Sequence, residues 1–207
     1  MLDKTTTIEA FLDGAAAKQP TPGGGSVAAL AGALAAAMGE MVLNYSVGKK
    51  GLEKYESLLK PALERLNRQR ESLLDSMLLD QRAYELLTNA KKLPKDDPQR
   101  EWKISAATKV CISIPETIMG AAEMILAMAE EIVDFVNPYL LSDLAVCAEL
   151  AMATSRAAFY SVRINLPGIA DAELRRQREK DCEKNLSRSV TRIQRLIPRI
   201  WERVSRS

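Results

Sequence analysis

Apolar residues recur along most of the chain at spacings of three and four positions, the repeat of helices with one buried face. Prolines and glycines interrupt this pattern at intervals, and no segment alternates with the two-residue repeat of a strand. The pattern predicts an all-α protein of about six helices. The last predicted helix shows it most clearly, with apolar residues at Leu186, Val190, Ile193, Ile197, Ile200 and Val204.

Capping residues and helix breakers set the predicted boundaries. Thr6 and Glu9 form a capping box at the first helix, Asp97 caps the fourth with Pro98 at its first position, and Asn137 caps the fifth. Short connections between long helices favour an up-and-down bundle. The predicted helices cover approximately residues 6–20, 26–47, 53–90, 98–135, 138–164 and 171 to near the C-terminus.

Composition agrees with one helical domain over residues 1–207, rich in alanine, leucine and methionine and poor in aromatic residues. A net charge of +2 gives no reason to expect a nucleic-acid or membrane binder. The most apolar run, residues 27–39, is too short to span a bilayer. The polar N-terminus does not resemble a signal peptide, so a cytoplasmic protein with reduced cysteines is expected.

The chain contains no histidine, which excludes a His-ligated metal site and any mechanism with an imidazole base. No two of the three cysteines have the spacing of metal ligands. Acid–base chemistry would therefore use Asp, Glu, Lys, Tyr or Cys side chains.

One carboxylate lies on an apolar stripe of the third predicted helix. Asp80 falls between Met77 and Tyr84 on the face that also carries Leu66, Leu73 and Leu87. An unpaired charge on a buried face is costly, so Asp80 is a candidate functional residue. An internal ion pair or a helix cap would explain it equally well.

A second carboxylate is expected to point inward from the fifth helix. Asp143 shares a face with Asn165, opposite a polar face that carries Glu149, Arg156 and Arg163. Its place in the first turn is also explained by the helix dipole. Asp143 and Asn165 lie roughly 33 Å apart along one helix. If both are functional, they contact different parts of a long ligand or different sites in an oligomer.

The glycine-rich turn from Gly23 to Ser26 precedes the second helix, where free N–H groups at a helix start can bind an anion. No Gly-Lys-Ser/Thr follows, so the turn is not a P-loop. Small residues continue into the helix, and close packing is their expected role. They are Gly32, Ala33, Ala36, Ala37 and Gly39.

Arginines form a stripe on the last helix, opposite its apolar residues. The expected role is a solvated basic face, and an acidic partner such as polyglutamate or nucleic acid is the alternative. The stripe consists of Arg188, Arg192, Arg195, Arg199, Arg203 and Arg206.

Several of these features occur together, in the same order, in one family. The chain resembles the cyclodeaminase part of the formiminotransferase-cyclodeaminase family over nearly its whole length. The matching blocks are Pro20 to Ala29, Met41-Val42, Gly48-Lys49-Lys50, Asp80 with Ala83, Lys92 to Lys95, Ser113-Ile114-Pro115, Ser142-Asp143-Leu144 and Val162 to Leu166.

The resemblance implies a helical homodimer that binds a reduced folate, which can carry a polyglutamate tail. It implies no metal, nucleotide or redox cofactor. It implies a formiminotetrahydrofolate cyclodeaminase, or alternatively a methenyltetrahydrofolate cyclohydrolase. Asp80 and Asp143 are then the catalytic candidates. The substrate-binding candidates are Pro22, Gly23, Gly24, Gly25, Ser26, Lys49, Lys92 and Asn165.

Two interpretations from other functional classes stay open. One is a non-catalytic helical dimer that binds folate or a protein, although buried carboxylates add little to a purely structural bundle. The other is a nucleic-acid accessory protein that uses the arginine stripe, for which steep salt dependence of binding is the expected sign.

Overall fold

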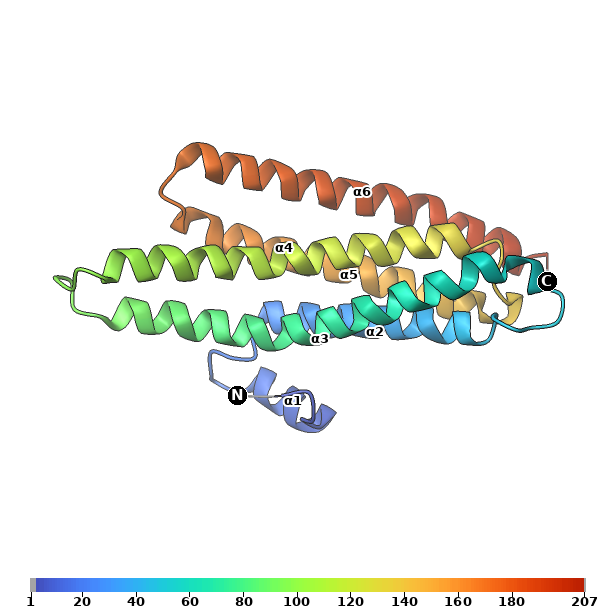
Figure 1. Cartoon of the computed structure of the whole chain (residues 1–207), viewed down its shortest axis with the longest axis horizontal. Helices are drawn as coiled ribbons and strands as arrows, with labels where there is room; N and C mark the ends of the chain where they lie inside the picture. Colours follow the sequence, from blue (N-terminus) through green and yellow to red (C-terminus); the bar gives the residue numbers. More distant parts are fainter. Residues whose placement is uncertain (1–2, 207) are drawn as a thin grey trace.

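The computed structural model describes residues 3–206, which form six α-helices joined by short connections (Figure 1). Within these residues no strand occurs, so the predicted all-α class is confirmed. The helices are α1 (Ile8–Ala16), α2 (Gly24–Asn44), α3 (Glu56–Lys92), α4 (Arg100–Ile132), α5 (Leu141–Asn165) and α6 (Ala172–Val204).

Helices α2 to α5 form an up-and-down four-helix bundle, in which each helix packs on the next and α5 packs on α2. In Figure 1, α3 and α4 lie in front and α2 and α5 behind them. Helix α6 lies against α4 and α5. Helix α1 lies apart from the four long helices and is held by the buried Phe11 and an ion pair between Lys4 and Asp75.

Two predicted helix starts are confirmed by their caps. The Asn137 side chain accepts a hydrogen bond from the backbone N–H of Tyr139, at the start of a short 3-10 turn that leads into α5. Asp171 accepts bonds from the backbone N–H groups of Glu173 and Leu174 at the start of α6. The amide of Asn137 and the carboxylate of Asp171 thus accept hydrogen bonds from backbone N–H groups that a helix start leaves unpaired.

Two other predicted caps are wrong by one or two positions. Thr7 caps α1, because the side chain of Thr6 instead accepts a bond from the backbone of Asp3. Asp97 accepts a bond from the N–H of Gln99 in a local turn, so α4 begins only after that turn. In both cases a nearby backbone donor competes for the polar side chain.

The small residues of α2 pack the bundle closely, as predicted. A Cβ at Gly32 would lie 2.9 Å from the Thr154 side chain and 3.1 Å from Leu73. A Cβ at Gly39 would lie 2.8 Å from Leu66. Both glycines therefore allow α2 to approach α3 and α5 more closely than larger residues would permit.

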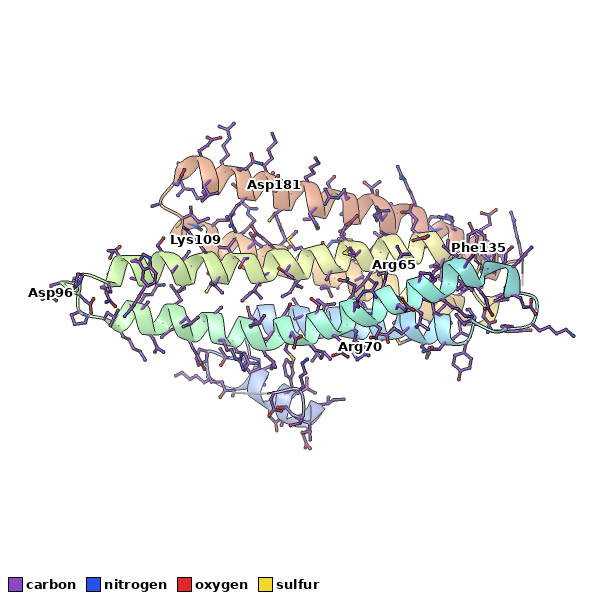
Figure 2. The ribbon with its side chains drawn as sticks, viewed as in Figure 1. Arg65, Arg70, Asp96, Lys109, Phe135 and Asp181 are labelled. Carbon is purple, nitrogen blue, oxygen red and sulfur yellow. The ribbon has the colours of Figure 1, made fainter. Side chains whose placement is uncertain are left out.

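The arginine stripe of α6 is a solvated face only in part: Arg188, Arg195 and Arg206 are exposed, as predicted, whereas Arg192, Arg199 and Arg203 are half-buried. A row of carboxylates on α4 faces it, because α6 packs its apolar residues onto α4 and α5 and thereby brings its arginines beside α4. The pairs are Arg178–Glu116 at 2.9 Å, Arg192–Glu123 at 2.8 Å, Arg192–Glu130 at 2.5 Å and Arg199–Asp134 at 2.6 Å. Within the bundle, α3 makes similar pairs through Arg65 to Glu131 and Arg70 to Glu40 (Figure 2).

Arg192→Met is expected to lower the free energy of unfolding by about 1–3 kcal/mol. The change leaves Glu123 and Glu130 without the guanidinium that joins them, at positions where both carboxylates are largely buried. Urea unfolding followed by circular dichroism measures it. Arg195→Met, at an exposed position of the same stripe, is the matched control. Equal midpoints for the two variants would show that the α4–α6 pairs do not stabilise the fold.

Helices α2 and α4 are each long and apolar enough to cross a membrane by length and composition. More than half of the apolar window of each is buried inside the bundle. This burial fits core helices of the bundle, which pass the same criterion.

Candidate functional site

A carboxylate from α3 lies at the start of α2. Helix α2 begins at Gly24, earlier than predicted, and its N-cap Gly23 has no side chain to satisfy the first N–H groups. The hydroxyl of Ser26 donates to Asp80 Oδ2 at 2.9 Å, and its backbone N–H also donates to this carboxylate. Asp80 therefore caps α2 from a neighbouring helix.

Gly25 makes room for this carboxylate. A Cβ at Gly25 would lie 2.1 Å from Asp80 Oδ1 and 2.6 Å from its Cγ, which no real contact allows. The glycine turn thus serves the site through steric space at Gly25 rather than through flexibility alone. Pro22, buried beside it, follows a cis peptide bond with Thr21.

Burial raises the pKa of the Asp80 carboxyl above its ordinary value, while the hydrogen bonds from Ser26 oppose that change. In residues 3–206, no lysine or arginine forms a salt bridge with Asp80. Of the two structural explanations, the helix cap is therefore present and the ion pair is not. A carboxyl that holds its proton to higher pH is better suited to exchange it with a substrate near neutrality.

Cys111 of α4 and Asn165, at the C-terminal end of α5, lie on the side of the site next to α3. Asn165 Nδ2 donates to the carbonyl of Ser161 at 2.8 Å and to that of Cys111 at 3.4 Å. The Cys111 thiol donates to the carbonyl of Ala83 at 3.4 Å. Burial and, after it, the charge of Asp80 raise the pKa of Cys111. The thiol thus stays neutral next to the carboxylate.

Sequence reasoning treated Cys111 as an ordinary buried thiol and did not connect it with Asp80. Its position depends on how α3 and α4 pair. The loop predicted between residues 90 and 98 could have supplied this register, since a hairpin that turns near Asp96 places α4 residues opposite defined α3 residues (Figure 2).

The site has an open side at the α2 N-terminus. A depression of about 770 Å³ lies there, lined by Gly24, Ala157, Tyr160, Ser161, Arg163 and Ile164. Tyr160 and Ile164 are strongly exposed, and Arg163 forms a peripheral ion pair with Glu179 at 3.6 Å. A ligand entering this depression would meet the first turn of α2.

The other predicted site residues lie elsewhere in the chain. Lys49 donates to Asn137 Oδ1 at 2.6 Å at the opposite end of the bundle, and Lys92 is exposed at the end of α3. Asp143 lies in the first turn of α5, 18 residues before Ser161 and thus roughly 27 Å away along the helix. One chain therefore brings together Asp80, the glycine turn and Asn165 but does not bring Asp143 to them.

Ser26→Ala is expected to move the limb of the pH–rate profile that reports Asp80 to higher pH. Hydrogen bonds to a carboxylate favour its charged form, so losing the Ser26 hydroxyl raises the pKa of Asp80 further. The measurement is kcat against pH. Ser76→Ala is the control, because the Ser76 hydroxyl donates within its own helix, to the carbonyl of Ser72. An unmoved limb in Ser26→Ala would assign that limb to another group.

Comparison with known proteins identifies the family of this chain. The sequence model described as Formiminotransferase-cyclodeaminase matches residues 7–184, most of the chain. The chain belongs to this family. The predicted resemblance is thereby confirmed, and it extends through the helices that build the Asp80 site.

Relatives within the family have different sizes. A methenyltetrahydrofolate cyclohydrolase of Methylorubrum extorquens is 32% identical over 203 residues, which cover 96% of this chain and 98% of the relative. A formimidoyltransferase-cyclodeaminase of Gallus gallus is 31% identical over 175 residues, but these cover only 32% of the chicken protein. This chain thus corresponds to about a third of the chicken protein.

A solved structure shares the fold. The crystal structure of formiminotetrahydrofolate cyclodeaminase from Thermotoga maritima superposes with a TM-score of 0.82 and 27% identity, covering 97% of this chain and 96% of that one. Nearly every helix described above, α6 included, is therefore part of the shared architecture. Among the described residues, 3–206, no three Cys, Asp or Glu side chains are arranged to hold a metal ion.

Proposed function

We propose that this family member is a formiminotetrahydrofolate cyclodeaminase, which closes the one-carbon bridge between N5 and N10 of tetrahydrofolate and releases ammonia. The observation that carries the proposal is Asp80, a largely buried carboxyl with a raised pKa at the open start of α2. The family match and the Thermotoga structure supply the substrate class.

The reaction needs one group that takes and returns a proton. N10 of the protonated 5-formimino substrate attacks the formimino carbon and forms a tetrahedral centre. Asp80 accepts the N10 proton and passes it to the amino group, which leaves as ammonia while the C–N bond breaks. The product is the 5,10-methenyl cation. Proton transfer of this kind contributes about 10²–10⁴ in rate, and no electron is gained or lost.

The surroundings of Asp80 suit this task. The Ser26 hydroxyl fixes one carboxylate oxygen, so the other faces Gly25 and the first turn of α2. Asn165 is held by two carbonyls and can present its amide oxygen to a donor on the pterin. Fixed groups of this kind lower the cost of orienting a substrate.

A second candidate is methenyltetrahydrofolate cyclohydrolase. It is favoured by the Methylorubrum relative, which matches this chain almost from end to end. In that reaction water attacks the same carbon of the 5,10-methenyl cation, and N5 leaves. Asp80 would take one water proton and return it to N5 as the bond between that carbon and N5 breaks, while the second water proton is released to solvent when the formyl C=O forms. Both activities thus use the same carboxyl, and only the fourth substituent of the tetrahedral carbon differs.

Absorbance of 5,10-methenyltetrahydrofolate separates these reactions. One assay begins from 5-formiminotetrahydrofolate with ammonia measured in parallel, and the other begins from the methenyl compound. Gain of the methenyl band with equal ammonia release supports cyclodeaminase. Faster loss of the band in the second assay alone supports cyclohydrolase. Rates equal to the blank in both would overturn the proposal and favour a non-catalytic binding protein.

In the same proposal, the enzyme is a cytoplasmic homodimer that uses no cofactor besides its folate substrate. A polyglutamate tail would run outward from the pterin, and the exposed Lys92 is the candidate for its carboxylates. Lys49, at the opposite end of the same chain, would reach a tail only across a dimer.

A further inference from the structure

The linked ends of α3 and α4 carry an apolar groove. These ends form a helical hairpin that projects beyond the other helices of the bundle (Figure 1). The groove lies between the last turns of α3 and the first turns of α4, and its volume is about 410 Å³. A concave apolar site of this size is typical of small-molecule binding. The apolar lining residues are Leu86, Ala90, Leu93, Trp102, Ala106 and Val110.

Two large apolar side chains of this groove are exposed to solvent. Trp102 is 70% exposed, and Leu86, on the facing helix, is 56% exposed. Covering such surface is favourable for a ligand with an apolar body, because apolar area is then removed from water. A tryptophan beside aliphatic walls is also suited to contact a flat aromatic ring.

The polar side chains of the groove are hydrogen-bond donors without a partner. Lys103 is half-buried on the α4 side, and Asn89 lies on the α3 side. Within residues 3–206, neither side chain forms a hydrogen bond or an ion pair. Arg100, also half-buried near the start of α4, is by contrast paired with Glu101. A half-buried ammonium without a counter-ion at an apolar surface favours a bound anion.

The charge of the surrounding hairpin points to the same kind of ligand. Residues 82–110 contain seven basic and four acidic side chains, whereas the whole chain has a net charge of only +2. Among the described residues that line the groove, none is acidic. The local field therefore attracts anions, most strongly at low ionic strength.

We propose that the hairpin groove is a ligand site, separate from the Asp80 site, that binds a small apolar carboxylate such as an aromatic acid. The apolar body of the ligand contacts Trp102 and Leu86. Its carboxylate accepts hydrogen bonds from the Lys103 ammonium and the Asn89 amide, of which the charge-assisted bond from lysine is the stronger. The site does not depend on the proposed reaction.

The groove and the Asp80 site lie on different sides of α3. Leu86 follows Asp80 by six residues, which places it about 120° away around the helix and about 9 Å along it. Asp80 faces the start of α2, where Ser26 donates to it. The groove instead opens between α3 and α4. A carboxylate bound there leaves the space beside Asp80 free.

Binding of 4-phenylbutanoate tests the site. The chain contains two tryptophans, Trp102 and Trp201, so Trp201→Phe assigns the indole N–H signals in ¹⁵N–¹H spectra. The Trp102 signal is expected to move with a dissociation constant on the order of 1 mM, as small ligands of this size allow, and the Trp201 signal is expected to stay in place. No movement of the Trp102 signal at about 10 mM probe, ten times that constant, would overturn the proposal.

The uncharged analogue 4-phenylbutanamide tests the role of the carboxylate. It has the same apolar body and is expected to bind about tenfold more weakly, because it lacks the charge that meets Lys103. Lys103→Met, which keeps an apolar side chain, is expected to remove this difference. Lys109→Met is the control, because Lys109 is an exposed residue of α4 outside the lining. Equal affinities of the acid and the amide for the wild-type protein would overturn the preference for a carboxylate.

Three further measurements test the location. Ala106→Phe fills the groove and is expected to abolish binding of both probes; retained binding would place them elsewhere on the chain and overturn the site. Saturation with 5-formyltetrahydrofolate is expected to leave probe binding unchanged, whereas competition would assign the groove to the folate site and overturn a separate one. A fall in the sedimentation coefficient of Leu86→Glu would show that a second copy of the chain covers the groove, which would also overturn the proposal. None of these measurements requires turnover, so failure of the proposed activity would leave them unaffected.

Discussion

Asp80→Asn is expected to lower kcat by about 10²–10⁴-fold, the usual contribution of a proton-transferring group. Asparagine keeps the size of the side chain and can still accept the bond from Ser26, so the start of α2 should persist. What it loses is the exchangeable proton. The measurement is initial rate from the absorbance of the methenyl product, with circular dichroism to confirm folding.

The same variant is expected to be no less stable than wild type near neutral pH. Because burial raises the pKa of Asp80, its charged form is disfavoured in the folded protein. This destabilisation of the wild-type protein is absent below the unfolded-state pKa of Asp80. It grows as pH rises from that value to the folded-state pKa, and it is complete above the folded-state pKa. Glu85→Gln, at an exposed position of the same helix, is the control. Full activity in Asp80→Asn would remove Asp80 from the mechanism.

Gly25→Ala is expected to reduce activity about 100-fold, since displacement of a reacting group by about 1 Å has that effect. The added Cβ would overlap Asp80 Oδ1 at 2.1 Å, so either the carboxylate or the start of α2 must move. We also expect a loss of about 1–3 kcal/mol in the free energy of unfolding from the overpacked contact. Steady-state kinetics and urea unfolding measure the two effects.

Gly120→Ala is the control for this substitution. Gly120 is also a helical glycine, but a Cβ there meets no atom within 4 Å. Alanine should therefore stabilise α4 slightly, by about 0.5–1 kcal/mol, and leave kcat unchanged. Normal kinetics in Gly25→Ala would mean that the close approach of Gly25 and Asp80 has no bearing on catalysis.

Helical periodicity predicted all six helices because each buries one face against the bundle, and the period survives local exceptions. Caps were predicted less accurately. Asn137 behaves as expected, but Thr6 and Asp97 accept hydrogen bonds from other backbone N–H groups, three and two residues away. Such competition depends on turn geometry, which short polar motifs do not determine.

The candidate site was predictable in part. Helical spacing placed Asp80 on a buried face and Asn165 on an inward one, and both lie by the glycine turn. The spacing could not tell which end of one helix meets which end of another. Asp143 and Lys49 therefore lie far from Asp80 in the same chain, although the family motif contains all of them.

The arginine stripe also shows that helical spacing does not determine how two helices pack on each other. A helical wheel describes one helix and its solvent face in isolation. Glu116, Glu123 and Glu130 recur every seven residues on α4, so they form a row of their own. Only the packing of α6 on α4 reveals that Arg178 pairs with Glu116 and that Arg192 joins Glu123 and Glu130.

The bond from Ser26 N–H to Asp80 makes one backbone amide a natural probe of the reaction. Each proton that reaches the carboxylate weakens the acceptor for this amide, and each departure strengthens it. The ¹⁵N–¹H resonance of Ser26 should therefore titrate with Asp80 and shift again when substrate binds. A spectroscopist could follow the protonation state of the site through a main-chain signal, without labelling the carboxyl itself.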